Sequence, residues 1–134
     1  PIKQNTFTGK ISSHQPYIFD ICHMGQLMSN RGKGMEFAYE MSTLIWSVKN
    51  WNKDDFLEPL FADFGEDLSE VRQSIKLNEA QLIEEIKFNQ QKQKNAGHHG
   101  VPLNVYKEKY YFGQDEPFDN FINELINDGM IKEF

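Results

Sequence analysis

Cysteine is nearly absent from this sequence of 134 residues, in which Cys22 stands alone. A single cysteine excludes an internal disulfide and a C-x-x-C redox pair within these residues, and it favours a reducing compartment. No apolar run is long enough to span a bilayer. The opening residues, Pro-Ile-Lys-Gln-Asn, lack the apolar stretch of a signal peptide. The sequence therefore predicts a cytoplasmic protein with no membrane partner.

Positive charge is also scarce. The 14 Lys and Arg residues are outnumbered by 20 Asp and Glu residues, which leaves a net charge of −6. A general nucleic-acid binder needs a basic face to neutralise phosphates, so we expect no nucleic-acid partner. Hydrophobic residues make up 39% of the chain and aromatic residues 13%. This composition is typical of a globular protein of about one domain and is too aromatic for a disordered one.

Helical patterns dominate residues 16–97. The clearest apolar stripe has spacings of four, three, one and three residues, and it consists of Phe37, Met41, Leu44, Ile45 and Val48. Asn52 is predicted to cap the next helix and Gly65 to end it. Asp67 and Asn78 each precede a Glu or Gln by three residues, which is the spacing of a capping box. The predicted helical segments are 16–28, 35–48, 52–65, 67–75 and 78–97, whereas 1–15 reads as an extended segment.

The residues with the most reactive side chains do not form a recognisable site. Cys22 lies on the apolar side of the first predicted helix, and we interpret it as a buried thiol. His23 follows it directly, and adjacent helical residues point about a quarter turn apart, so a Cys–His pair is not expected. His98 and His99 lack a third ligand at a recognised spacing. We therefore predict no metal site and assign no catalytic residue within this chain.

Beyond Gly100 the pattern changes from helical to strand-like. Alternating apolar residues predict a strand over 101–106, the pair Lys107 and Glu108 a turn, and 109–112 a returning strand. Pro117 suits the first turn of a last helix. A lone hairpin is marginally stable in water, so we expect it to pair with another strand. We also expect the last helix to cover the hairpin face that consists of Val101, Leu103 and Val105, through Phe118, Ile122 and Leu125.

Two segments resemble a known family. Residues 96–102 read Ala-Gly-His-His-Gly-Val-Pro, and residues 111–115 read Tyr-Phe-Gly-Gln-Asp. In this order and spacing they resemble the signature of DsbA-like proteins in the 2-hydroxychromene-2-carboxylate isomerase and kappa-class glutathione transferase group. The stretch 37–57 resembles the helical insert of the same proteins. The resemblance implies an α/β, thioredoxin-like (DsbA-like) fold with a helical insertion. This chain would be mostly α, with a β-hairpin and a C-terminal helix.

The resemblance also implies a glutathione site. It implies a cis Val101–Pro102 bond, with the backbone of Val101 and Pro102 pairing with glutathione as an added strand would. Gln114 and Asp115 are expected to meet the γ-glutamyl end of glutathione, where backbone donors take its carboxylate and Asp115 takes its ammonium. Family members usually carry Arg after this Asp, whereas this chain has Glu116.

The resemblance divides the chain into three parts. Residues 1–15 would be an extended segment of the thioredoxin-like domain, 16–97 the helical insertion domain, and 98–134 the C-terminal thioredoxin-like part. The family's first strand and helix, which carry the catalytic Ser or Cys, have no counterpart in this sequence. We therefore expect the β-α element to be missing at the N-terminus and this chain alone to be inactive.

The leading function implied is a glutathione-dependent isomerase or transferase with a small-molecule substrate and glutathione as cosubstrate. A thiol–disulfide oxidoreductase of DsbA type is the second hypothesis, and its C-x-x-C would lie upstream of this chain. A non-catalytic fragment or scaffold is the third. A homodimer is one way in which the hairpin would gain a neighbouring strand.

Overall fold

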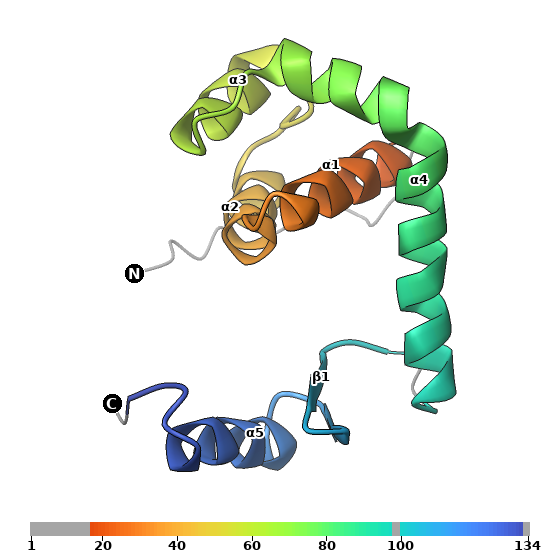
Figure 1. Cartoon of the computed structure of the whole chain (residues 1–134). Helices are drawn as coiled ribbons and strands as arrows, with labels where there is room; N and C mark the ends of the chain where they lie inside the picture. Colours follow the sequence, from red (N-terminus) through yellow and green to blue (C-terminus); the bar gives the residue numbers. More distant parts are fainter. Residues whose placement is uncertain (1–16, 98–99, 133–134) are drawn as a thin grey trace. The chain divides into compact units, whose positions relative to one another are not determined.

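The computed structural model describes residues 17–97 and 100–132 (Figure 1). Within them, five helices and one two-stranded antiparallel sheet confirm the prediction of a mostly helical chain with a hairpin. The elements in chain order are α1 (Ile18–Asn30), α2 (Gly34–Ser47), α3 (Asp54–Asp63), α4 (Leu68–Asn95), β1 (Leu103–Tyr106), β2 (Lys109–Phe112) and α5 (Glu116–Asn127). The chain divides into two compact units, 1–86 and 87–134. The predicted extended segment 1–15 lies outside the described residues.

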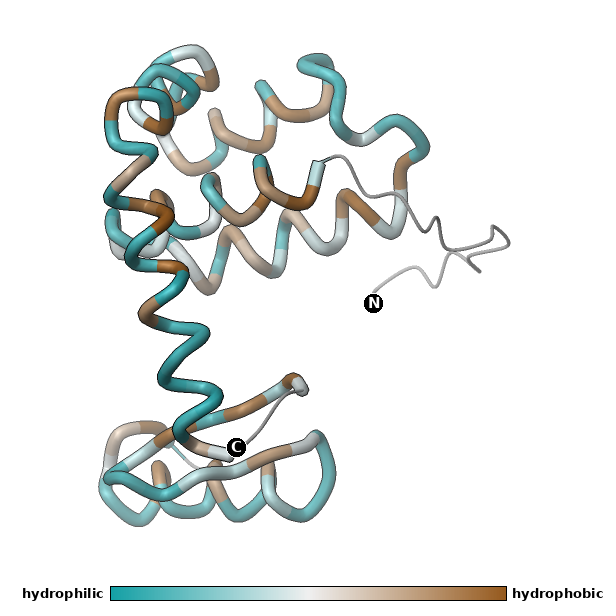
Figure 2. The backbone as a smooth tube through the Cα atoms, turned by 90° about the vertical axis from the view of Figure 1, so that its right-hand side faces the viewer, coloured by the Kyte–Doolittle hydropathy of each residue, from teal (hydrophilic) through white to brown (hydrophobic). Residues whose placement is uncertain are grey.

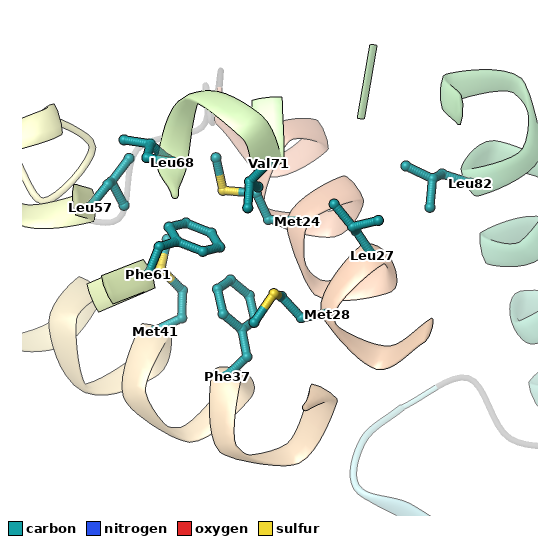
Figure 3. Packing of buried hydrophobic residues seen from close by; sticks show 10 residues of the cluster. All are labelled: Met24, Leu27, Met28, Phe37, Met41, Leu57, Phe61, Leu68, Val71 and Leu82. Carbon is teal, nitrogen blue, oxygen red and sulfur yellow. The ribbon is translucent and has the colours of Figure 1, made fainter. Parts of the chain in front are cut away.

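The first unit has an apolar core built from α1 to α4 (Figure 3). Its buried members are Met24, Leu27, Met28, Phe37, Met41, Leu57, Phe61, Leu68, Val71 and Leu82. Phe37 and Phe61 are almost wholly shielded from solvent, and their ring centroids lie 5.5 Å apart. These two rings join α2 to α3. The stripe predicted on α2 is confirmed at its first two positions, because Phe37 and Met41 are both buried.

An ion-pair cluster joins the loop before α2 to the loop before α4. The Glu66 carboxylate accepts hydrogen bonds from Arg31 at 2.5 Å and from Lys33 at 2.9 Å. Lys33 also donates to the carbonyl of Phe64 at 2.8 Å. The Glu66 side chain is only 15% exposed, so these bonds replace water that the carboxylate has lost.

The start of α3 differs from the prediction. Lys53, not Asn52, precedes its first turn, and no side chain caps the helix. Asp54 and Asp55 lie in that turn, where negative charge suits the helix dipole. The prediction that Gly65 ends the segment is confirmed, since its φ of 72° lies in the left-handed region that glycine adopts without strain.

Helix α4 consists of two helices that meet at a kink, as the sequence predicted. The first cap is confirmed, because Asp67 Oδ1 accepts the backbone N–H of Glu70 at 3.0 Å. The kink lies at the predicted residue, Asn78, whose φ of −114° and ψ of 16° are not helical. Its side chain donates back to the carbonyl of Ser74 at 2.8 Å, which satisfies a backbone acceptor inside the helix. Figure 2 shows the hydrophilic character of the second half of α4.

In the second unit, β1 and β2 form the predicted hairpin. Tyr106 pairs with Lys109, and Lys107 and Glu108 turn the chain with φ values of 48° and 62°. Positive φ at both central residues is typical of a type I′ turn, whose twist matches that of the two flanking strands. Helix α5 packs against both strands.

The hairpin face that α5 covers is the opposite of the predicted one. Tyr111 is buried, and its ring centroid lies 5.6 Å from that of Phe121 on α5. The ring centroid of Tyr106 lies 6.5 Å from that of the same Phe121 ring. Val101 and Val105 remain 84% and 55% exposed. The prediction failed because the two large tyrosine rings supply more apolar area to this helix than the valines do.

Candidate functional site

The loop that leads into β1 carries the first predicted motif. The Val101–Pro102 peptide bond is cis, as predicted. Val101 is exposed and Pro102 is half-buried. The carbonyl of Gly100 accepts a hydrogen bond from Gln93 Nε2 at 2.7 Å, which ties the loop to the end of α4. A Cβ at Gly100 would lie 3.1 Å from the Phe112 ring, so a larger residue there requires that ring to move.

One hydrogen bond brings the second motif beside the first. The backbone N–H of Gly113 donates to the carbonyl of Pro102 at 3.1 Å. Gly113 has a φ of 109°, a conformation that residues with a Cβ rarely adopt. The turn that follows holds Gln114 and Asp115, and both are exposed. All four predicted site residues are therefore at the same end of the hairpin, although Gly113 follows Val101 by twelve positions in the sequence.

The first turn of α5 offers few donors to an anion. The carbonyl of Asp115 accepts the backbone N–H groups of Phe118 and Asp119 at 2.9 and 3.1 Å. Pro117 has no N–H. The Asp115 side chain makes no capping bond, and Glu116 and Asp119 add two further carboxylates to this turn. The turn is therefore better suited to an ammonium group than to a carboxylate.

The outer edge of β1 is open within the described part of the chain, since the sheet has two strands there. In a two-residue hairpin the hydrogen-bonded pairs alternate, so Tyr106–Lys109 and Asn104–Tyr111 exchange bonds. The bond from Gly113 to Pro102 continues this alternation. The backbone groups of Leu103 and Val105 consequently point away from β2, where an extended peptide finds donors and acceptors.

The face of the hairpin that packs on α5 is tied by charged side chains. Asp128 accepts a hydrogen bond from Tyr106 at 2.7 Å and pairs with Lys107 at 2.6 Å. Lys107 and Tyr106 together lower the pKa of the Asp128 carboxyl. Lys109 pairs with Glu124 and lowers the pKa of that carboxyl, while the pKa of the ammonium rises. These groups are fixed to one another and serve the packing of the hairpin.

The prediction that the Cys22 thiol is buried is wrong. Cys22 is exposed, because the inward side of α1 carries Met24, Leu27 and Met28 instead. His23 is half-buried next to it. Across the described ranges, no three His, Cys, Asp or Glu side chains are grouped so as to hold a metal ion. The predicted pair His98 and His99 lies outside those ranges.

A hollow that sequence reasoning did not find lies in the first unit. It has a volume of about 510 Å³ and is bordered by α1, α4 and the loop before α3. Tyr17 and Trp51 meet edge to face in its wall, with centroids 5.6 Å apart. Arg72 also lines it, and two hydrogen bonds of 3.0 and 2.5 Å hold its guanidinium against Asp54. The hollow thus places two aromatic rings beside an arginine whose charge Asp54 balances. No spacing in the sequence connects these positions, which the packing of three segments brings together.

The ion pair at this hollow also shifts the pKa of both partners. Hydrogen bonding to Arg72 lowers the pKa of the Asp54 carboxyl and raises the pKa of the guanidinium. The pair thus stays ionised across the physiological range.

Among the helices of the described residues, none has the length and apolarity that a membrane crossing requires. Comparisons of the chain with protein-family models, with curated proteins and with solved structures each found no match.

Proposed function

We propose that this chain carries the glutathione-binding part of a thioredoxin-like, DsbA-like protein that acts as a glutathione-dependent isomerase or transferase. The observation that carries the proposal is the hydrogen bond from the Gly113 N–H to the Pro102 carbonyl. It places the Val101–Pro102 loop beside the Gln114–Asp115 turn. These are the two segments on which the resemblance to glutathione-using proteins depends.

Glutathione would bind as a short extended strand along the open edge of β1. Its backbone amides and carbonyls would pair with those of Val101 and Leu103, which point away from β2. Its γ-glutamyl ammonium would lie at the exposed Asp115 carboxylate. The neighbouring Glu116 favours the same ammonium and disfavours the adjacent carboxylate of the ligand, so binding to this chain is expected to be weak.

The chemistry proposed is a reversible thiol addition. The glutathione thiolate would add to an electron-poor carbon of an unsaturated or quinoid small molecule and turn a double bond into a single bond. Rotation about that bond and expulsion of the thiolate would return glutathione unchanged and leave an isomer. Positioning the thiolate and keeping it ionised are what a protein contributes to such a step. No side chain of this chain is assigned a catalytic role.

The test is a titration of the ¹⁵N-labelled chain with reduced glutathione, followed by NMR. We expect saturable shifts at the amides of Leu103, Gln114 and Asp115. A control ligand that lacks the γ-glutamyl amino group should bind more weakly, because it cannot pair with Asp115. Shifts spread evenly over the chain, or an unchanged affinity for the control ligand, would refute this assignment.

A further inference from the structure

A groove between α2 and α3 in the first unit has no role in the proposed function. Its volume is about 580 Å³. Apolar side chains form its floor, and Leu44, Leu60 and Phe64 among them are half-buried. Phe56 adds a ring that is 37% exposed. The groove thus presents apolar surface that the folded chain itself leaves partly uncovered.

The walls of this groove carry charge of one sign. Helix α2 contributes Glu36 and Glu40, and helix α3 contributes Asp55 and Asp63. No Lys, Arg or His is among the residues that line it. Within the described residues, no ion pair involves any of these four carboxylates.

The four carboxylates of this groove differ in this respect from two others of the unit. Glu66 and Asp54 each have a cationic partner within the fold. Glu36 and Glu40 are instead four residues apart on one helix, where like charges repel and reduce helix stability. A positively charged partner removes that repulsion, and the apolar floor provides the area that such a partner would bury.

We propose that the α2–α3 groove binds a basic amphipathic helix of a partner protein. Apolar side chains at one face of that helix would fill the floor, as in other helix-in-groove complexes. Its Lys or Arg side chains would extend over the rim to the four carboxylates. Asp55 and Asp63 are separated by about 12 Å along α3 at 1.5 Å per residue, which matches about two turns of a docked helix. This site is independent of the glutathione proposal.

A second copy of this chain is the competing occupant. Its net charge of −6 opposes self-association. The stretch of α4 that carries Lys87, Lys92 and Lys94 is basic, but Phe88 is the one large apolar side chain there. One ring is a poor match for a floor that several apolar side chains form.

The test uses the full chain and a synthetic helix of about 14 residues with Leu at the apolar positions and Lys elsewhere. Fluorescence anisotropy should show saturable binding that weakens as salt is raised. The double variant Glu40→Gln/Asp63→Asn should weaken binding about fivefold, because it removes two exposed charge pairs with the peptide. The control variant Glu70→Gln/Glu79→Gln removes the same charge from α4 and should leave the affinity unchanged. Phe56→Ala should also weaken binding.

Four outcomes would overturn the proposal. The first is no binding up to about 1 mM, which corresponds to about −4 kcal/mol. The second is an equal loss of affinity in both double variants, which would show that only the overall charge of the chain matters. The third is equal binding of a matched peptide with Glu in place of Lys. The fourth is a dimer in sedimentation that Glu40→Gln/Asp63→Asn dissociates, which would assign the groove to a second copy.

Discussion

Tyr111 on β2 packs its ring on Phe121 of α5, and its hydroxyl is buried near the Glu124 carboxylate without a hydrogen bond of normal geometry among the described residues. Burial raises the pKa of this phenol and the Glu124 carboxylate raises it further, so the group stays neutral at physiological pH. A buried hydroxyl that has lost water without gaining a partner opposes folding. The ring therefore stabilises the second unit while its hydroxyl destabilises it.

Replacement of Tyr111 separates these two effects. We expect Tyr111→Phe to raise the thermal midpoint of the second unit by about 2–4 °C, because it keeps the ring and removes the unsatisfied hydroxyl. Tyr111→Ala should lower the midpoint by more than about 10 °C. Hydrogen exchange at the hairpin amides and thermal denaturation measure both changes. A lower midpoint for Tyr111→Phe would mean that the hydroxyl has a partner after all.

Phe61 and Phe56 provide a matched pair on α3. Phe61 is fully buried against Phe37, whereas Phe56 is 37% exposed. We expect Phe61→Ala to lower the free energy of unfolding by about 3–5 kcal/mol, from lost burial and the cavity left behind. Phe56→Ala should cost about 1 kcal/mol or less. Urea denaturation followed by tryptophan fluorescence reports on the first unit, since Trp46 and Trp51 both lie in it. Equal losses would contradict the core assignment.

Acid should destabilise the first unit through Glu85. Asn30 on α1 donates to this carboxylate at 2.6 Å and, with Gln81, lowers its pKa below the ordinary value of 4.5. A carboxyl whose pKa is lower in the folded state adds stability above its unfolded pKa. That stability is lost as the pH falls below 4.5 and through the folded value. Lowered pKa values at Asp54 and Asp67 act in the same direction.

Variants at Asn30 test this link. Asn30→Ala should reduce the loss of the thermal midpoint between pH 6 and pH 3, because Glu85 then contributes less to stability at the higher pH. Gln73→Ala, an exposed amide on α4, is the control and should leave the pH profile unchanged. The two profiles would coincide if Glu85 were not involved.

Local signals in the sequence were enough to place most elements. The apolar period located α2, the capping spacing at Asp67 located the start of α4, and the alternation after Gly100 located the hairpin. The sequence also predicts the break at Asn78, but not the hydrogen bond that its side chain makes. Asn78 bonds back to Ser74 and leaves a kink, although the same residue type is a common cap.

Features that depend on three-dimensional packing could not be predicted from the sequence. Which hairpin face meets α5 depends on how Tyr106 and Tyr111 fit around Phe121, and alternation alone is satisfied by either face. The hollow beside Trp51 and Arg72 needs three segments from different parts of the chain. The placement of Val101 and Asp115 at one end of the hairpin, in contrast, follows from the hairpin register that the sequence predicted.

Asp115 should contribute to glutathione affinity through its charge. It is exposed at the start of α5, and its side chain makes no capping bond that a ligand would have to break. Solvent screens an exposed pair, so we expect Asp115→Asn to weaken glutathione binding only about two- to fivefold. Glu108→Gln removes the same charge from the exposed turn at the opposite end of the hairpin and is the control, with no expected change. Calorimetry at low and high salt measures both variants, and the difference between them should shrink at high salt. If Asp115→Asn and the parent chain bind glutathione equally at low salt, the ammonium contact does not form and the γ-glutamyl end lies elsewhere.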